Sequence, residues 1–488
     1  MFSRDKVSLF GLIFGLFTLS LFLFSDHPEG LSRIGWLTAG IALLMTIWWV
    51  TEAIPIYVTG LIPLILFPVF NIFNLKIIAS SYSHPLVLLF IGGFIIASAM
   101  ESSGLHKRIA LNLLRLSGTS PSKIIAGFMF TTALISMWVS NTASTIMMLP
   151  IALSVIAIFS NQANISNKNF AVPLLLSIAY SASIGGATTL IGTPTNIMLS
   201  GILSDSYNFE ISFADWFLIG FPIAIILLPL VWFFLTKFSF RVSNKKSDAL
   251  ENTIKKMQND LGKSSFTEKS VGLIFMLTAL LWIFRRTLND LFNLNLNDTS
   301  IGLFGALLLF LIPTGKGTRA CDWNTANKIP WGILLLVGGG IALSKAFNSS
   351  GLAMWLGSFS NYLYGYELYF LILISVFLII FLTELNSNTA TIATFAPILI
   401  IFAIGIEENP LFFVIPATIA ASCAFMLPVA TPPNAVVYGS GKIEIKDMIK
   451  AGLVLNLISL IVISFVGVLL VNQVFDSETM QNFMSSIF

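Results

Sequence analysis

Long apolar runs, separated by short polar stretches, dominate the chain. Eleven of them predict membrane-spanning helices, since crossing the apolar core of a bilayer takes about 20 helical residues. The eleven runs fall near residues 7–25, 36–51, 54–72, 84–104, 170–203, 215–236, 269–285, 300–312, 331–347, 410–440 and 450–473. The run near 300–312 is the least distinct. The pattern predicts an all-α polytopic membrane protein.

Two further apolar stretches, about 122–160 and 367–403, each carry a polar tripeptide near the middle. The first holds Ser140-Asn141-Thr142 and the second holds Ser387-Asn388-Thr389. Each stretch is long enough to reach the membrane midplane in about 10 residues, at about 1.5 Å each, and to return to the same side. A polar tip at that depth indicates two re-entrant hairpins rather than two crossings.

The tripeptides belong to a longer internal repeat. One constant interval separates Asn141 from Asn388, Ser136 from Thr383, Gly104 from Gly351, and Gly92-Gly93 from Gly339-Gly340. At a slightly shorter interval, Gly192-Thr193-Pro194-Thr195-Asn196 corresponds to Ala430-Thr431-Pro432-Pro433-Asn434. Duplicated halves with polar interruptions at matching places are typical of secondary transporters.

Composition supports this reading and excludes several classes of protein. Of 488 residues, 56% are hydrophobic and 10% are charged, and the mean hydropathy is +0.89. A soluble domain of this size needs far more charge on its surface. The two cysteines and three histidines form no disulfide framework, metal cluster or catalytic triad in the sequence. The N-terminal apolar run lacks a good cleavage site, so we expect an uncleaved first helix.

Positive charge predicts the orientation. With the N-terminus in the cytoplasm and both polar-tipped stretches as hairpins, most of the 26 Lys and Arg residues fall on the cytoplasmic side. The first hairpin then enters from the cytoplasm and the second from outside, which gives two repeats of inverted topology and an external C-terminus. The basic segment 237–269 is expected to be a cytoplasmic linker on the inner leaflet, with no nucleic-acid role. Short loops suggest a bacterial inner (plasma) membrane.

The polar tips suit one anion and one cation. A hairpin tip exposes carbonyls at the end of its incoming helix and N–H groups at the start of its outgoing helix. The N–H end attracts a carboxylate, whereas the carbonyls and the Ser and Asn side-chain oxygens suit Na⁺. The segments Gly192-Thr193-Pro194 and Ala430-Thr431-Pro432 predict two broken helices at the same depth. The alternative, that Ser, Thr and Pro only kink and cap helices, does not account for two matched pairs.

The predicted site holds no Arg or Lys, which favours release of a dianion once Na⁺ leaves. Three acids lie in or near the apolar runs. Glu52 and Glu101 are expected to cap or pack helix ends, whereas Glu384 could tune a cation site or serve only as a structural hydrogen-bond acceptor.

At these residues the sequence resembles the divalent anion/sodium symporter family of Na⁺-coupled dicarboxylate, citrate and sulfate carriers. The resemblance covers about residues 36–473. Its most specific parts are the paired tripeptides, the segment Trp48–Pro55, and the pattern Ser422-x-x-Phe425-x-x-Pro428-Val429-Ala430-x-x-x-Asn434. Thr195 departs from the family pattern, which often has Pro there, and Asn386 stands where a small residue is common.

The resemblance implies a homodimeric elevator transporter in the lipid bilayer. Its domains would be scaffold helices 1–120, a transport half 121–236, the linker 237–269, scaffold helices 270–350 and a transport half 351–488. The ligands of the first Na⁺ would be Ser136, Ser140, Asn141 and Gly192. Those of the second would be Thr383, Asn386, Ser387, Asn388 and Ala430. The substrate would contact Asn141, Thr142, Thr193, Pro194, Asn388, Thr389, Thr431 and Pro432.

The leading hypothesis is therefore Na⁺-coupled symport of C4-dicarboxylates such as succinate, malate and fumarate. Within the class, sulfate or citrate symport and Na⁺-independent dicarboxylate exchange stay open. A membrane-embedded enzyme would need paired acids, His ligands or a nucleophile–base pair, and the sequence displays none. A channel would be distinguished by its much higher conductance.

Overall fold

The protein is helical throughout the part that its structure, a computed structural model, describes. That part comprises residues 4–118, 120–162, 168–242, 258–314, 319–363, 365–475, 478–481 and 483. The first half contains α1 (Arg4–Phe24), α2 (Arg33–Thr51), α3 (Ile56–Thr59), α4 (Ile62–Val69), α5 (Leu75–Tyr82), α6 (Pro85–Ser103), α7 (Leu105–Leu116), α8 (Pro121–Ser136), α9 (Asn141–Gln162), α10 (Lys168–Ala187), α11 (Pro194–Tyr207), α12 (Phe213–Phe233) and η1 (Phe234–Ser239).

The later part of the second half repeats the order of the helices from α6 to α12. It contains α14 (Phe266–Ile283), α15 (Arg285–Phe292), α16 (Asp298–Leu311), α17 (Trp323–Ala326), α18 (Trp331–Ser349), α19 (Leu352–Gly357), η2 (Ser358–Leu363), α20 (Leu368–Thr383), α21 (Asn388–Gly405), α22 (Leu411–Ala421), α23 (Pro432–Tyr438) and α24 (Ile445–Val474). Within the described residues, the one β-type pairing is an isolated bridge between Pro313 and Arg319.

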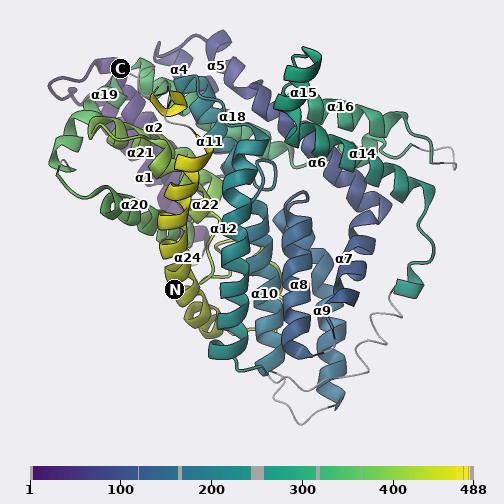
Figure 1. Cartoon of the computed structure of the whole chain (residues 1–488). Coiled ribbons are helices and arrows are strands. Elements are labelled where there is room, and N and C mark those ends of the chain that lie inside the picture. The colour runs from purple at the N-terminus through teal and green to yellow at the C-terminus, as the bar shows by residue number, and fades with distance from the viewer. Residues whose placement is uncertain are drawn as a thin grey trace.

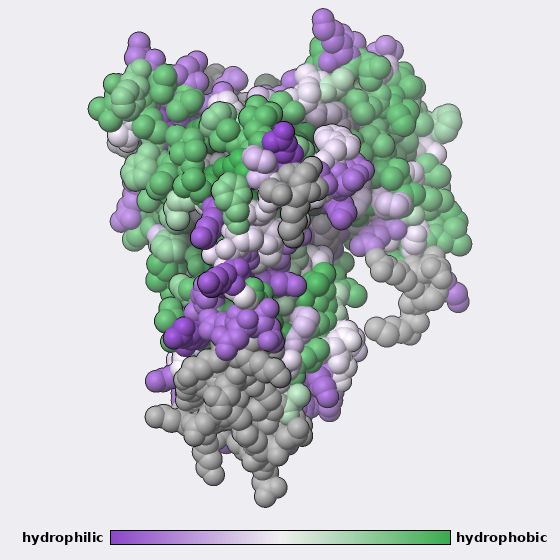
Figure 2. Space-filling model, turned by 90° about the vertical axis from the view of Figure 1, so that its right-hand side faces the viewer, coloured by the Kyte–Doolittle hydropathy of each residue, from purple (hydrophilic) through white to green (hydrophobic). Residues whose placement is uncertain are grey.

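Nine helical segments of the described chain are long and apolar enough to span a membrane. All eleven predicted runs are largely helical, but their continuity varies. The run 54–72 is divided near Gly60 into α3 and α4, and α16 has only 14 residues. One of the nine long segments, α21, is an arm of the second predicted hairpin. Figure 2 shows apolar side chains over much of one face, with polar residues gathered at its top edge and lower down.

Both tripeptides lie at helix–helix turns, as predicted. α8 ends at Ser136 and α9 begins at Asn141, while α20 ends at Thr383 and α21 begins at Asn388. The two predicted breaks also occur, because α10 is separated from α11 and α22 from α23 by non-helical segments. The hairpins 121–162 and 368–405 are therefore established as helical hairpins, and their re-entrant insertion stays a prediction.

The helices pack in two groups. The hairpin group, α8–α12 with α20–α24, packs internally through pairs such as α8 with α10, α12 with α24, and α20 with α22. The flanking group, α1–α6 with α14–α18, packs through pairs such as α6 with α16 and α5 with α18. The two groups also pack directly on one another, through α11 with α18 and α18 with α21, and α7 and α19 contact both groups. In Figure 1, α8, α9, α10 and α12 run side by side in the lower half, and α14–α16 lie at the upper right.

The two glycines of each repeated pair, Gly92-Gly93 and Gly339-Gly340, contact different groups. A Cβ on Gly92 would lie 2.6 Å from the carbonyl carbon of Gly302 in α16, inside the flanking group. A Cβ on Gly339 would lie 2.4 Å from the carbonyl oxygen of Gly60, also inside that group. The second glycine of each pair instead faces the hairpin group, where Gly93 lies against Ile191 and Gly340 against α11 and α21.

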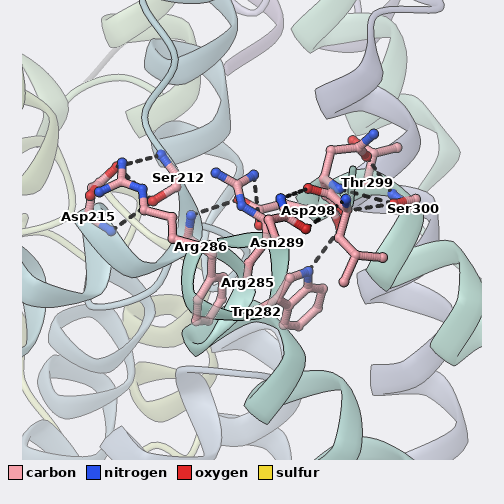
Figure 3. Close-up of polar contacts among 12 residues, drawn as sticks. Ser212, Asp215, Trp282, Arg285, Arg286, Asn289, Asp298, Thr299 and Ser300 are labelled. Carbon is pink, nitrogen blue, oxygen red and sulfur yellow. Dashed lines mark hydrogen bonds and ion pairs between the residues drawn. The ribbon is translucent and has the colours of Figure 1, made fainter. Parts of the chain in front are cut away.

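A cluster of charges joins the start of α12 to the flanking group (Figure 3). Arg286 forms an ion pair of 2.7 Å with Asp215, and Asp298 accepts a 2.8 Å hydrogen bond from the backbone N–H of Phe213. Arg285 lies 3.2 Å from the other carboxylate oxygen of Asp298. Asp215 also completes the capping box of α12 with Ser212. One carboxylate therefore caps the N-terminus of α12 and binds Arg286.

The predicted linker 237–269 lies partly outside the described residues, which omit 243–257. The described part that begins at residue 258 is fixed to α7. Arg108 pairs with Glu268 and donates to the carbonyls of Leu261 and Gly262. The amphipathic helix α7 is thereby tied to the segment that precedes α14.

We expect Gly92→Ala and Gly339→Ala each to destabilise the protein by about 1–3 kcal/mol, because the new methyl group would overlap backbone atoms that cannot rotate away. Thermal unfolding of the purified protein in detergent measures this. Gly93→Ala is the matched control, because its Cβ would meet Ile191 at an ordinary 3.6 Å. Equal losses at Gly92 and Gly93 would contradict the assignment.

Candidate functional site

The two hairpin tips have the same polar contact. In the first, the hydroxyl of Ser136 lies 2.7 Å from Oδ1 of Asn141 and 2.7 Å from the carbonyl oxygen of Ala182. In the second, the hydroxyl of Thr383 lies 2.7 Å from Oδ1 of Asn388 and 2.9 Å from the carbonyl oxygen of Ala421. A hydroxyl has one proton and cannot donate to both acceptors at once. Each tip is therefore an oxygen-rich cluster with a shortage of protons.

The two broken helices restart with nearly identical backbone geometry. Thr193 precedes α11 with φ −141° and ψ 144°, and Thr431 precedes α23 with φ −141° and ψ 149°. Each helix then begins with Pro, which has no N–H to satisfy and a φ suited to a first turn. The sequence pattern Thr-Pro thus fixes where each helix restarts.

One Asn in each repeat satisfies the carbonyls of the break. The amide nitrogen of Asn196 donates to the carbonyl of Thr189 at 2.7 Å, with longer contacts to two further carbonyls. The amide nitrogen of Asn434 donates to the carbonyls of Ala424 and Leu427 at 2.9 and 3.0 Å. Both side chains are fully buried. Without these donors, the carbonyls would stay unpaired away from water.

Residues remote in sequence supply the other partners of the breaks. The indole N–H of Trp216 donates to the carbonyl of Ala187 at 2.9 Å, and the hydroxyl of Tyr180 donates to the carbonyl of Phe425 at 2.7 Å. In the second repeat, three successive backbone N–H groups, those of residues 425–427, donate to the carboxylate of Glu384.

Helices of the two repeats pack against each other at the site. α23 of the second repeat packs on α9 of the first, and α11 of the first packs on α21 of the second. The hydroxyl of Thr195 lies 3.3 Å from that of Thr389 and 3.4 Å from that of Thr193. Thr195 is therefore the hydroxyl at which the two repeats meet, in the position where the sequence departs from the family pattern.

Glycine lets the first tip approach the first break. A Cβ on Gly186 would lie 2.1 Å from Oδ1 of Asn141, and one on Gly192 would lie 2.4 Å from the carbonyl oxygen of Gly186. Asn141 and Gly192 thus both lie close to Gly186. Their shared role as ligands of the first cation stays a prediction.

These tips fit a small hard cation. Among the described residues, three matched positions carry a buried side-chain oxygen without a hydrogen-bond partner in both repeats. They are Ser144, Ser183 and Asn196 in the first repeat and Thr391, Ser422 and Asn434 in the second. Neutral oxygens of this kind are ligands for Na⁺. Within the described residues, no group of three or more His, Cys, Asp or Glu side chains could hold a metal ion. The chemistry therefore favours an alkali cation over a transition metal.

The same region fits an anion without a basic side chain. α9, α11 and α21 begin at the tips and the first break, so their free N–H groups and partial positive charges lie there. None of the predicted substrate residues is Lys or Arg. At these residues, an anion would be attracted by helix N-termini and neutral side chains.

The remaining predicted residues lie beside these contacts. Ser140 accepts a hydrogen bond from the N–H of Ala143, and Asn386 accepts one from the N–H of Ser387, so both side chains support their turns. Ala430, Pro432 and Pro194 lie at the two restarts, and Thr142 and Thr389 lie in the first turns of α9 and α21. Their roles as ligands stay predictions.

Sequence reasoning missed Tyr180 and Trp216. Each lies in an apolar run, where an aromatic side chain signals packing, and neither has a local polar pattern. Their partners lie in other helices, so only the folded arrangement identifies them.

We expect Asn196→Ala and Asn434→Ala each to lower the unfolding free energy by about 2–4 kcal/mol, because buried carbonyls lose their donors. Thermal unfolding in detergent, without substrate, is the measurement. Asn472→Ala, at an exposed position of α24, is the control and should change stability by less than about 0.5 kcal/mol. A similar stability in all three variants would refute the role of these amides.

Comparison with known proteins adds the family and two named relatives. Residues 6–475 match the sodium:sulfate symporter transmembrane region. The chain is 42% identical over 491 residues to the sodium-dependent dicarboxylate transporter SdcS of Staphylococcus saprophyticus, covering 98% of this chain and 94% of that protein. It is 43% identical over 470 residues to SdcS of Staphylococcus aureus strain USA300, covering 94% and 90%.

The fold also resembles a solved structure. The YdaH transporter of Alcanivorax borkumensis superposes with a TM-score of 0.57 at 15% identity, over 95% of this chain and 98% of that one. At this identity the likeness concerns the fold alone.

Proposed function

The chain belongs to the sodium:sulfate symporter family, and we propose that it carries C4-dicarboxylates such as succinate, malate and fumarate across the cell membrane together with Na⁺. The observation that carries this proposal is the paired oxygen cluster at the two hairpin tips, Ser136 with Asn141 and Thr383 with Asn388. The relatives named for sodium-dependent dicarboxylate transport support the choice of both solutes.

Coupling follows from the lack of a basic side chain among the predicted substrate residues. Backbone dipoles attract a dianion weakly, and the positive charge of bound Na⁺ adds the rest of the attraction. When Na⁺ dissociates into the low-sodium cytoplasm, that attraction is lost and the substrate is released. A fixed Arg at the same place would hold the dianion on both sides of the membrane.

The membrane arrangement is proposed as eleven crossings and two re-entrant hairpins, with the N-terminus in the cytoplasm and the C-terminus outside. The distribution of Lys and Arg and the two matched repeats support it. A homodimer in a bacterial plasma membrane is part of the same proposal and rests on the family resemblance.

Transport is proposed to proceed by sliding of the hairpin group along the flanking group. Two observations support this division. At the second glycine of each repeated pair, no side chain of the flanking group stands between the two groups: Gly93 lies against Ile191, and Gly340 lies against Met198 and Ala393. Among the described residues, the polar contacts between the two groups lie around the α11–α12 turn.

Those contacts hold the α11–α12 turn from two sides. On one side, Asp205 pairs with Lys345 at 3.2 Å, and the hydroxyls of Ser206 and Ser344 are 3.0 Å apart. On the other side lies the Arg286–Asp215 cluster of Figure 3. Sliding would have to separate both sets.

Purified protein in liposomes should accumulate labelled succinate when a Na⁺ gradient is imposed, and should not do so with an equal K⁺ gradient. Asn141→Ala and Asn388→Ala should each raise the half-saturating Na⁺ concentration about tenfold, because each loses an oxygen ligand worth about 1.4 kcal/mol. Asn472→Ala is the control. Unchanged Na⁺ activation in both site variants would exclude them as ligands.

A panel of competing anions separates the alternatives in the same assay. Inhibition by sulfate or citrate, but not by malate or fumarate, would replace the proposed substrate. Exchange of internal for external succinate without Na⁺ would replace the proposed coupling.

Cross-linking tests the sliding movement. The hydroxyl separation of Ser206 and Ser344 lets the double variant Ser206→Cys/Ser344→Cys form a disulfide between α11 and α18. We expect oxidation to abolish uptake and a reductant to restore it, with the two single variants active throughout. Full uptake by a protein shown by mass spectrometry to be cross-linked would contradict the sliding of these groups.

A further inference from the structure

A groove lies between the end of α7, the first half of α8 and the last turn of α12, away from the hairpin tips. Its volume is about 260 Å³, and its walls are mostly apolar. Leu113 and Leu116 of α7, Ala126 and Phe130 of α8, and Trp232 of α12 line it. Leu116 and Phe130 are 81% and 57% exposed, so the groove is open at the surface of the protein. An exposed apolar surface of this kind marks a place where another molecule binds.

Two close contacts hold the walls of the groove in place. The indole N–H of Trp232 donates to the carbonyl of Ser122 at 2.8 Å, which ties the end of α12 to the start of α8. A Cβ on Gly127 would lie 2.2 Å from the Cβ of Ser117, so the residue that follows α7 rests directly on α8. The groove is therefore part of the packing of the three helices and does not depend on a loose side chain.

The position of the groove matches the boundary between lipid and water. Trp232 has an apolar body inside the groove and a polar N–H at its edge, and such side chains are enriched at membrane interfaces. α7 is amphipathic, and under the proposed membrane arrangement the start of α8 and the end of α12 lie on the cytoplasmic side. The groove would then open into the inner leaflet, where acyl chains meet their headgroups.

The surroundings of the groove are basic. Lys123 lines it directly. Four exposed basic side chains belong to these helix ends or to the residues just beyond α12, namely Arg115, Lys123, Lys237 and Arg241. None of the four forms an ion pair with another described residue. The sequence has no Asp or Glu in residues 105–123 or 216–242. The local field therefore attracts an anion.

An apolar groove and an unpaired basic cluster, side by side, are complementary to one kind of molecule. A free phosphate would bind the basic cluster without using the groove, and a neutral lipid would use the groove without the basic cluster. An anionic phospholipid uses both, because its phosphate and its acyl chain are joined.

We propose that this groove binds an anionic phospholipid, with an acyl chain along Leu116 and Phe130 and the phosphate beside Lys123. Only its assignment to the inner leaflet rests on the proposed membrane arrangement, and binding itself is independent of the solute that the protein carries. Because α7 contacts both helix groups and α8 belongs to the hairpin group, the lipid would lie where the two groups are joined.

Binding can be measured on the purified protein in detergent. Phosphatidylglycerol and phosphatidylcholine with the same acyl chains are added in separate titrations, and the bound lipid is counted by native mass spectrometry. A basic residue near the headgroup strengthens binding of an anionic lipid about fivefold. We therefore expect the wild type to bind phosphatidylglycerol at least about fivefold more tightly than phosphatidylcholine.

The charge and the groove can be tested separately. Lys123→Gln should weaken binding of phosphatidylglycerol about fivefold and leave phosphatidylcholine unchanged. Lys328→Gln, which removes an exposed Lys between α17 and α18, is the matched control and should change neither. Ala126→Phe fills the groove and should weaken phosphatidylglycerol about tenfold, since at least two methylene groups lose their burial. Ile225→Phe, at an exposed position of α12 outside the groove, is its control.

Four results would overturn the proposal. One is equal affinity of the wild type for the two lipids. The second is an equal loss in the two Lys variants, which would mean that the charge acts without a site. The third is unchanged binding in Ala126→Phe, which would mean that no acyl chain lies in the groove. The fourth is displacement of the lipid by soluble glycerol 3-phosphate, which would indicate a phosphate site.

Thermal unfolding in detergent, without added lipid, checks that each variant is folded. If Ala126→Phe does not fold, Phe130→Ala replaces it, because this change removes an exposed wall of the groove and should weaken phosphatidylglycerol to a similar extent. Unchanged binding in that variant would overturn the proposal as well.

Discussion

The site depends on one constraint: backbone groups freed in the middle of an apolar helix must find partners away from water. Four helix interruptions create such groups at the two tips and the two breaks. The amides of Asn196 and Asn434 donate to carbonyls at the two breaks, Trp216 also donates to the carbonyl of Ala187, and Tyr180 donates to that of Phe425. Because these buried partners hold the breaks, the hydroxyl–amide clusters of the tips are left for ligands.

The local part of this arrangement could be predicted from the sequence. A polar tripeptide inside an apolar run locates a hairpin turn, and α9 and α21 do begin at Asn141 and Asn388. Thr-Pro inside an apolar run likewise locates the restarts of α11 and α23. These signals are strong because a polar group is costly in an apolar run, so its presence there requires a reason.

The long-range part could not be predicted in this way. The hydroxyl of Tyr180 reaches the carbonyl of Phe425 across the two repeats, and no local pattern near either residue marks the pair. The division of the run 54–72 was missed for a similar reason. Gly60 lies where the chain must pass close to Gly339, and its carbonyl accepts a 2.5 Å hydrogen bond from the hydroxyl of Tyr82. The pattern of hydrophobic residues does not reveal such close backbone contacts.

Duplication explains why the site can hold two like cations, but it does not explain why they would act in sequence. Two identical tips would bind Na⁺ with equal strength and would present the same field to the substrate. The chain departs from that equality at several positions, among them Glu384 opposite Met137, Asn386 opposite Val139 and Thr195 opposite Pro433. The pair Glu384 and Met137 differs in chemical character, whereas Thr195 places a hydroxyl 3.3 Å from that of Thr389, where the repeats meet. Under the proposed function, a difference of the first kind would act on the ions and one of the second kind on contacts with the substrate. Coupling and selectivity would then depend on different departures from the same repeated scaffold.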